Sequence, residues 1–230
     1  MIGDRSTMLA RLATLVADGA AERPLTVRLA LAGRELLHAD GASISVDSTT
    51  PNRVMLAATD EVAQTLEQLQ DVLCQGPSWD AYLSGQPQFT DLRNIAAARW
   101  PEFEYAAREA VGERMVIGLP MHPDHEVIGV LSVHLSVSYS ADDWEIAQFV
   151  ANTVGAALLT DPDAIKEQGG SWSGRAEIHQ ATGMVIAQLS IPAADALAVL
   201  RAHAYADGVS LDAIAAQVVG RTLEFRRGTP

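Results

Sequence analysis

The segment from Glu113 to Leu135, ERMVIGLPMHPDHEVIGVLSVHL, decides the fold class of this 230-residue chain. It predicts two strands joined by the turn HPDHE, because Pro and Asp are typical turn residues. One face of the second strand carries Val127, Gly129, Leu131, Val133 and Leu135, and the other carries Ile128, Val130, Ser132 and His134. Both faces are largely apolar, so we expect a central strand that is covered on both sides.

Helical and extended periods alternate around this hairpin. Helices are predicted over residues 5–17, 24–38, 60–73, 79–83, 99–110 and 141–159, and strands over 42–46, 53–58 and 88–90. Ser140 is the expected N-cap of the last helix, with Asp142 and Asp143 in its first turn. Helices that bracket an antiparallel sheet make an α+β domain.

A second region follows the stretch TDPDAIKEQGGSWSG (160–174), where Asp, Pro, Gly and Ser cluster. The rest of the chain has a helical period, with helices expected over 174–189, over about 193–207 and after the N-cap Ser210. The Asp207-Gly208 pair is a helix-stop signal. We therefore predict an α+β domain over residues 1–160, a linker over 161–173 and an all-α three-helix bundle over 174–227.

Charge is distributed unevenly along the chain, whose formal net charge is −13. Residues 164–230 hold six basic and six acidic side chains, so the whole excess of acid lies in residues 1–163. An acidic front half repels polyanions, and a nucleic-acid contact would therefore belong to the back segment. The N-terminus lacks the pattern of a secretory signal, and the apolar segment 146–159 is too short and too interrupted to span a bilayer. A cytoplasmic protein without a membrane contact is expected.

Three strings in the front half carry a family resemblance: LQDVLCQGPSWDA (69–81), RWPEF (99–103) and EVIGVL (126–131). They resemble the GAF domains that are fused to ANTAR domains in actinobacteria, and the resemblance covers roughly residues 20–160. In that pattern the residue after Gly-Pro is often Cys, whereas this chain has Ser78 there and Cys74 four residues upstream. The resemblance implies a sensor domain, and the displaced cysteine argues against thiol chemistry at this position.

The back half resembles an ANTAR domain over nearly all of residues 172–225. The matching residues are Arg175, Ile178, the run QATGMV (180–185), Ala196, Leu200-Arg201, Ala204-Tyr205 and LDAIA (211–215). The resemblance implies binding of RNA stem-loops in nascent transcripts and prevention of transcription termination. It also implies a homodimer, for which we expect the helix at 141–159 and the helices within 5–38 to form the interface.

RNA binding needs cations for phosphates and planar groups for unstacked bases. The expected RNA-binding residues are Arg175, Arg201 and Arg221 for phosphates, His179, His203 and Tyr205 for stacking, and Gln180 for a base edge. The alternative interpretation makes the arginines part of a solvated surface and Tyr205 part of the core. Thr182 stands where many family members have a lysine or arginine, which removes one phosphate contact.

A GAF domain implies a pocket against the sheet for an unidentified small molecule. We expect Trp79, Asp80, Arg93, Met115 and His134 to line it, and the alternative is a well-filled core. No cofactor is identified. The pair His122 and His125 lies in a turn that already explains the local composition, so no metal site is predicted.

The sequence contains no nucleophile elbow, P-loop or dinucleotide motif, so we do not expect an enzyme. The expected function is a signal-responsive RNA-binding antitermination regulator, in which the helix at 141–159 relays the signal. One alternative is a protein-interaction module that dimerises without binding RNA. A GAF-type methionine sulfoxide reductase is a second, but that chemistry needs more than one cysteine, and a lone Cys74 is expected to be a small core hydrophobe.

Overall fold

The computed structural model describes residues 5–18, 22–46, 53–95, 98–124, 126–137, 144–160 and 172–225, with side chains from 177 onward in the last range. The chain divides into two compact units, Met1–Gly169 and Gly170–Pro230. Ser140, Asp142, Asp143 and His125 lie outside the described residues, as do most of the linker predicted over 161–173 and the basic pair 226–227.

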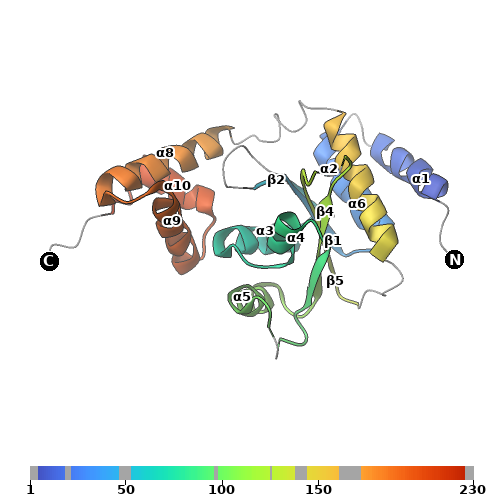
Figure 1. Cartoon of the computed structure of the whole chain (residues 1–230), viewed down its shortest axis with the longest axis horizontal. Coiled ribbons are helices and arrows are strands. Elements are labelled where there is room, and N and C mark those ends of the chain that lie inside the picture. The colour runs from blue at the N-terminus through green and yellow to red at the C-terminus, as the bar shows by residue number, and fades with distance from the viewer. Residues whose placement is uncertain are drawn as a thin grey trace. The chain divides into compact units, whose positions relative to one another are not determined.

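The first unit contains a five-stranded antiparallel sheet and helices on both of its faces (Figure 1). Its elements in chain order are α1 (Arg5–Ala17), α2 (Leu25–Leu36), β1 (Gly41–Val46), β2 (Val54–Ala58), α3 (Glu61–Leu73), α4 (Pro77–Ser84), β3 (Gln88–Asp91), α5 (Pro101–Val111), β4 (Met115–Met121), β5 (Gly129–Leu135) and α6 (Trp144–Leu159). The strand order is β2-β1-β5-β4-β3, which places β5 in the centre as the sequence predicts. The expected α+β class is therefore confirmed.

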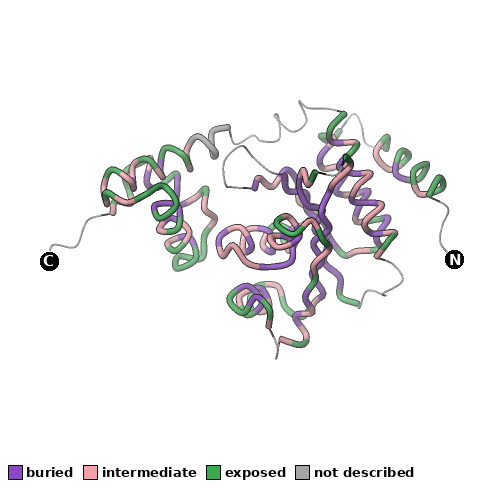
Figure 2. The backbone as a smooth tube through the Cα atoms, in the orientation of Figure 1, coloured by how far each residue is buried: buried purple, intermediate pink, exposed green. Residues whose placement is uncertain are grey.

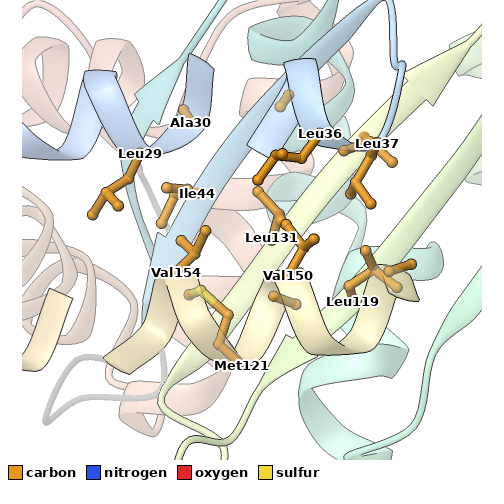
Figure 3. Packing of buried hydrophobic residues seen from close by; sticks show 14 of the residues in the cluster. Leu29, Ala30, Leu36, Leu37, Ile44, Leu119, Met121, Leu131, Val150 and Val154 are labelled. Carbon is orange, nitrogen blue, oxygen red and sulfur yellow. The ribbon is translucent and has the colours of Figure 1, made fainter. Parts of the chain in front are cut away.

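One face of the sheet packs on α2 and α6 and forms the main apolar core (Figure 3). Side chains from β4, β5 and β1 meet Leu29 of α2 and Val150 and Val154 of α6. The predicted buried stripe of α6, which is Ala147, Val150, Val154 and Leu158, is fully inside this core. In Figure 2 the three inner strands β1, β5 and β4 are coloured as buried, in agreement with their residues, every one of which is buried, whereas the edge strands β2 and β3 are only partly buried.

The opposite face of the sheet packs on α3 and α4, and α5 packs on α3 (Figure 1). The N-terminus of α4 lies directly on β4, because a Cβ built at Gly118 would meet the Pro77 carbonyl oxygen at 2.5 Å. This helix begins at Pro77 and not at Trp79 as predicted, since proline is well suited to the first helical turn. Glycine at position 118 therefore allows the helix to approach the strand this closely.

Pro120 marks a change in the pairing of β4. Strand β3 pairs with β4 only from Met115 to Gly118, and proline has no amide hydrogen with which to continue a ladder. The Pro120 carbonyl instead accepts a hydrogen bond from Gln148 Nε2 of α6 at 2.6 Å. This bond ties the strand to the helix that covers it.

Cys74 does not lie in the core, contrary to the expectation for a lone cysteine. It is only partly buried and adopts the left-handed conformation at the C-cap of α3, with φ of 52°. Its sulfur lies 3.8 Å from the Asp71 carbonyl oxygen. The residue therefore terminates a helix, a position that sequence composition does not reveal.

The second unit is a bundle of three helices, α8 (Trp172–Leu189), α9 (Ala193–Asp207) and α10 (Leu211–Val219), each of which packs on the other two. The predicted boundaries are confirmed: Gly208 ends α9 with φ of 64°, and the Ser210 side chain accepts a hydrogen bond from Ala213 N at 3.2 Å. The buried side chains are Ala181, Val185, Ala196, Leu197, Leu200, Ala204, Ile214, Ala215 and Val218. Ile178, Leu189, Leu211 and Leu223 of the predicted stripes are only partly buried.

No single helix in the described ranges is long and apolar enough to cross a membrane, and one pair, Glu177–Leu189 with Ala193–Asp207, qualifies only jointly across a bend of 106°.

Candidate functional site

The predicted RNA-binding residues of the second unit come from all three helical regions. His179 and Gln180 are exposed on α8, Tyr205 is exposed on α9, and Arg221 is exposed just after α10. Arg201 on α9 is partly buried. The backbone of Arg175 belongs to α8, but its side chain lies outside the described residues.

The residues on α9 are divided between two flanks of its buried stripe. Arg201 and Tyr205 are four residues apart and therefore lie on the same side of the helix. His203 lies on the other flank, where its ring meets the Phe225 ring edge-on with centroids 4.7 Å apart. The Phe225 amide also donates to Gln188 Oε1 at 2.9 Å. His203 thus helps to hold the segment after α10 against the bundle, and it does not join Arg201 and Tyr205.

Thr182 occupies the position at which related domains often carry a cation. Its hydroxyl donates to the Ile178 carbonyl oxygen at 2.7 Å, one turn back in α8. The Thr182 hydroxyl donates its hydrogen to the backbone of α8 and carries no charge, so Thr182 does not replace the cation of related domains.

The predicted lining of the GAF pocket is not gathered in one place. Met115 and His134 lie on opposite faces of the sheet, because Met115 belongs to the apolar core on the side of α2 and α6. Asp80 pairs with Arg99 at 3.1 Å, and Arg93 pairs with Asp91 at 2.7 Å. Of the five predicted residues only His134 lines the small cavity described below.

A buried polar cluster occupies the face of the sheet beneath α3 and α4. We call it the Arg53 cluster; it consists of Arg53, Glu67, Asp71, Ser43, Ser45, Ser78 and the ring of Trp79. Glu67 and Ser78 are completely buried, and Arg53 is 7% exposed. Sequence reasoning did not identify this cluster as a site.

Arg53 is the centre of the cluster. Its NH2 group lies 3.0 Å from Glu67 Oε1 and 2.8 Å from Asp71 Oδ1, and its NH1 group donates to Ser78 Oγ at 2.6 Å. The guanidinium carbon lies 5.2 Å from the centroid of the Trp79 ring, within cation–π range. Burial opposes the charge on Arg53, but the Glu67 and Asp71 carboxylates outweigh it and raise the pKa of Arg53 above its ordinary value.

Serine hydroxyls complete the coordination of Glu67. Oε1 accepts hydrogen bonds from Ser45 Oγ at 2.7 Å and from Ser78 Oγ at 2.9 Å, and Oε2 accepts one from Ser43 Oγ at 3.3 Å. Gln70 fixes the backbone beside it by accepting from Ser78 N at 2.7 Å. Both carboxylate oxygens of Glu67 are thus satisfied inside the protein.

His134 and Asp60 form a second polar pair on the same face. Asp60 caps α3 by accepting from Ala63 N at 2.9 Å, and its Oδ1 lies 3.1 Å from His134 Nε2. Arg114 NH1 lies 3.3 Å from His134 Nδ1. A guanidinium group can only donate, so we assign the proton of the neutral ring to Nε2, which donates to Asp60. A Cβ at Gly41 would lie 1.8 Å from Asp60 Oδ2, so only glycine leaves room for this pair.

Burial lowers the pKa of His134 below its ordinary value, although Asp60 opposes this effect. The Asp60 carboxyl is itself partly desolvated, yet hydrogen bonds from the Ala63 amide, Thr59 and His134 lower its pKa. The pair is therefore a neutral histidine that donates to an ionised carboxylate.

A cavity of about 10 Å³ lies between the two polar groups, with Ser43, Gln70, Ser132 and His134 in its lining. This volume accommodates about one water molecule. Ser132 Oγ is buried and has no hydrogen-bond partner among the described residues. The face of the sheet on which a ligand pocket was expected is thus filled largely by the chain's own polar side chains.

Two periodic patterns could have revealed the Arg53 cluster. Ser43 and Ser45 alternate with apolar residues on β1 and so lie on one face of the strand. Glu67, Gln70 and Asp71 are spaced three and four residues apart on α3 and form a polar stripe that faces those serines. Arg53 precedes a short strand, and nothing in its neighbourhood in the sequence indicates that it is buried.

The comparisons with known proteins bear on the fold just described. The model of the GAF domain family matches residues 25–159, which is more than half of the chain. The chain belongs to the GAF domain family. The model of the ANTAR domain matches residues 172–219, so the GAF domain is followed by an ANTAR domain.

Solved structures with a similar fold share little sequence with this GAF protein. The GAF domain of a phosphoenolpyruvate-protein phosphotransferase from Coxiella burnetii is 16% identical, with a TM-score of 0.47 over 70% of this chain and 98% of that one. The corresponding Acinetobacter domain is 14% identical, with a TM-score of 0.46 over 68% and 95%. A GAF domain/HD domain protein from Geobacter sulfurreducens is 12% identical, with a TM-score of 0.44 over 69% and 97%. No curated protein matches the chain.

A GAF sensor domain joined to an ANTAR RNA-binding antitermination domain is a signal-responsive antitermination regulator, not an enzyme. In the described residues no group of three or more His, Cys, Asp or Glu side chains is placed to hold a metal ion. In the turn between β4 and β5, His122 is among these described residues and His125 is not.

Proposed function

We propose that the RNA-binding surface of the ANTAR domain is centred on Arg201 and Tyr205 of α9, with Arg175, His179 and Gln180 of α8 and Arg221 as further contacts. The observation that carries this proposal is the spacing of Arg201 and Tyr205, which places a cation and an aromatic ring one helical turn apart. Tyr205 is 51% exposed, although aromatic rings are usually buried. A guanidinium for phosphate beside a ring for an unpaired base is the combination that folded RNA requires.

His203 is the least suited of the predicted residues. Its ring already packs against Phe225, and a base could stack on it only after that contact is lost. We therefore assign His203 to the stability of the bundle.

The test uses the full chain and a paired stem-loop RNA, with affinity measured at two salt concentrations. For Arg201→Glu we expect weaker binding and a decrease of about 1 in the slope of log affinity against log salt. Tyr205→Ala should weaken binding at both salt concentrations without changing the slope, because stacking releases no counterions. Arg99→Glu is the matched control, since it makes the same charge change on an exposed arginine of the GAF domain that lies outside α1 and α6.

Equal affinity and equal salt dependence for Arg201→Glu, Tyr205→Ala and the wild type would contradict the proposal. That result would favour the interaction module that dimerises without binding RNA. Weaker binding by Arg99→Glu to the same extent would mean that only the net charge matters.

We further propose that the protein acts as a homodimer through α1 and α6. Two exposed leucines support these helices as an interface, because Leu9 of α1 and Leu159 of α6 are each 44% exposed. Two ANTAR domains held in one dimer suit a paired RNA element, because once one domain has bound the RNA, binding by the second domain is intramolecular. Sedimentation of Leu9→Glu against the wild type tests this: a shift toward monomer is expected, and an unchanged mass would contradict it.

The relay from the sensor domain is proposed to run through α4, β4 and α6. Helix α4 touches β4 at Gly118, and β4 is tied to α6 by the bond from Gln148 to Pro120. Helix α6 leads along the chain to the linker and the ANTAR domain. Hydrogen exchange in α6 should increase in Gly118→Ala, because the added Cβ displaces α4; unchanged exchange in α6 would contradict the relay.

A cytoplasmic location, where nascent transcripts lie, and the actinobacterial type of the domain pair belong to the same proposal.

A further inference from the structure

The Arg53 cluster has the composition of a receptor for a planar cation. Two carboxylates, Glu67 and Asp71, face one guanidinium group, so the formal charges of these three side chains sum to −1. Three serine hydroxyls orient Glu67, and Trp79 presents the face of its ring to the cation. Carboxylates with an aromatic face are the chemistry that recognises guanidinium and related cations.

Arg53 reaches this receptor from an edge of the sheet. It directly precedes β2, which pairs only with β1, and its side chain crosses to contact α3 and α4. The Nε atom of Arg53 is buried, and none of the described residues accepts a hydrogen bond from it. Each terminal nitrogen of the guanidinium therefore has a partner, whereas Nε has none among the described residues.

The water-sized cavity adjoins the cluster and shares Ser43 and Gln70 with its surroundings. Ser132 Oγ lines this cavity, and Ser132 is 6% exposed and its hydroxyl lacks a partner in the described part of the chain. A buried hydroxyl without a partner costs free energy that a hydrogen-bonding occupant would recover. A single water molecule, which this volume accommodates, can supply that partner beside the Arg53 cluster.

We propose that Glu67, Asp71 and Trp79 form a binding site for small guanidinium compounds, which Arg53 occupies as an internal ligand, and that such compounds bind by exchanging with the Arg53 side chain. Exchange releases Arg53 and the start of β2 while Glu67 keeps a cation, so no buried charge is left unpaired. The inference names the signal class of the sensor domain. Only the statement that this exchange is a signal rests on the proposed function. The binding of guanidinium compounds is measured without RNA and can be tested separately.

The first experiment replaces the internal ligand. Arg53→Ala in the full chain is titrated with methylguanidinium, and the thermal midpoint of the GAF domain is recorded. We expect a saturable increase of about 3 to 6 °C at roughly ten times the dissociation constant. Methylurea, which is planar but neutral, and sodium chloride at equal concentration should give no increase.

Two further variants keep the result interpretable. Arg11→Ala removes an exposed arginine and should respond to methylguanidinium no more than the wild type does. Arg53→Gln keeps a hydrogen-bond donor and replaces Arg53→Ala if the latter is unfolded; recovery of its fold by methylguanidinium supports the proposal. An Arg53 variant that stays equally unstable with and without methylguanidinium, or that responds equally to methylurea, would overturn it.

The second experiment asks whether exchange occurs in the wild type, which distinguishes a ligand site from a merely structural ion pair. The Nε–H signal of Arg53 is observed by nitrogen-15 NMR and assigned by its absence in Arg53→Lys. Because a tethered group has an effective concentration of millimolar order, the probe is added to about 10 to 100 mM. Loss of protection of this signal is expected. An unchanged signal at about 100 mM methylguanidinium, at the top of this range, would overturn the exchange, whether or not the protein binds RNA.

Discussion

The GAF domain and the ANTAR domain of this protein handle buried polarity in opposite ways. The GAF domain has an apolar core on one face of its sheet, with large side chains such as Leu29, Ile44 and Leu131, and on the other face it buries charged groups. Of the nine buried side chains described in the ANTAR domain, four are alanines and none is charged. A large apolar core can offset the desolvation of a buried ion cluster, whereas a small core cannot. The GAF domain thus buries one ion cluster in addition to its surface pairs, whereas every charged side chain described in the ANTAR domain is partly or fully exposed.

The largest expected effect breaks the polar face of the GAF domain. Arg53→Ala should lower the free energy of unfolding by about 3 to 5 kcal/mol, because it leaves the Glu67 carboxylate buried without its cation. The double variant Arg53→Met with Glu67→Leu should recover most of this loss, since apolar groups of similar volume replace the pair. Urea denaturation of the full chain, followed by signals from each domain, measures both. A loss below about 1 kcal/mol for the single variant would mean that water reaches Glu67.

A smaller expected effect compares the two cores with the same substitution. Leu131 and Leu200 are both completely buried, and replacing either by alanine should cost about 3 kcal/mol. In Leu131→Ala the GAF domain should stay folded with a lower midpoint. In Leu200→Ala the ANTAR domain should lose its cooperative transition, because a bundle of this size has little stability to spare. The opposite ranking, seen by circular dichroism and domain-specific hydrogen exchange, would contradict the view of a marginal output domain.

Acid should weaken the GAF domain through His134. Its folded-state pKa lies below the ordinary value of 6.5, so the unfolded chain binds a proton before the folded one does. Stability should therefore be constant above about pH 7 and should fall as the pH decreases through 6.5. His134→Gln keeps a donor toward Asp60 and should flatten the profile between pH 7 and pH 5. A wild-type stability that is flat in this window would show that His134 is not held neutral.

The smallest expected effect concerns the surface of the ANTAR domain. Thr182→Arg places a cation where related domains often have one, and the lost bond to the Ile178 carbonyl leaves the helix intact. We expect tighter binding of the stem-loop RNA and a salt dependence steeper by roughly 0.7 to 0.9. Thr182→Ala is the control, because it removes the same bond without adding charge. If both variants bind like the wild type, this position does not face the RNA.

The fold was largely predictable because its signals are local. The two-sided apolar pattern of Val127–Leu135 correctly indicates the central strand, and the Gly208 and Ser210 signals correctly separate α9 from α10. Periodicity and capping depend on neighbours within a few residues, so a single sequence contains them.

The polar interior was not predictable in the same way. Arg53, Glu67 and Ser78 lie 14 and 11 residues apart along the chain and meet only after the sheet and α3 have formed. The residues expected to line the GAF pocket do not come together for a related reason. The sequence shows which residues lie on strands, but the pairing of β4 with β5 decides that Met115 and His134 lie on opposite faces of the sheet.

Pro120 also determines which backbone groups of the sheet are left open for pairing with a second molecule. The exposed margin of a sheet invites a strand from a second molecule, and β3 shields β4 only as far as Gly118. Past that point β4 leaves no backbone group open for pairing, because Pro120 is buried, has no amide hydrogen, and its carbonyl accepts from Gln148. The strand can therefore end its pairing with β3 here without exposing unpaired backbone at the stretch that anchors α6.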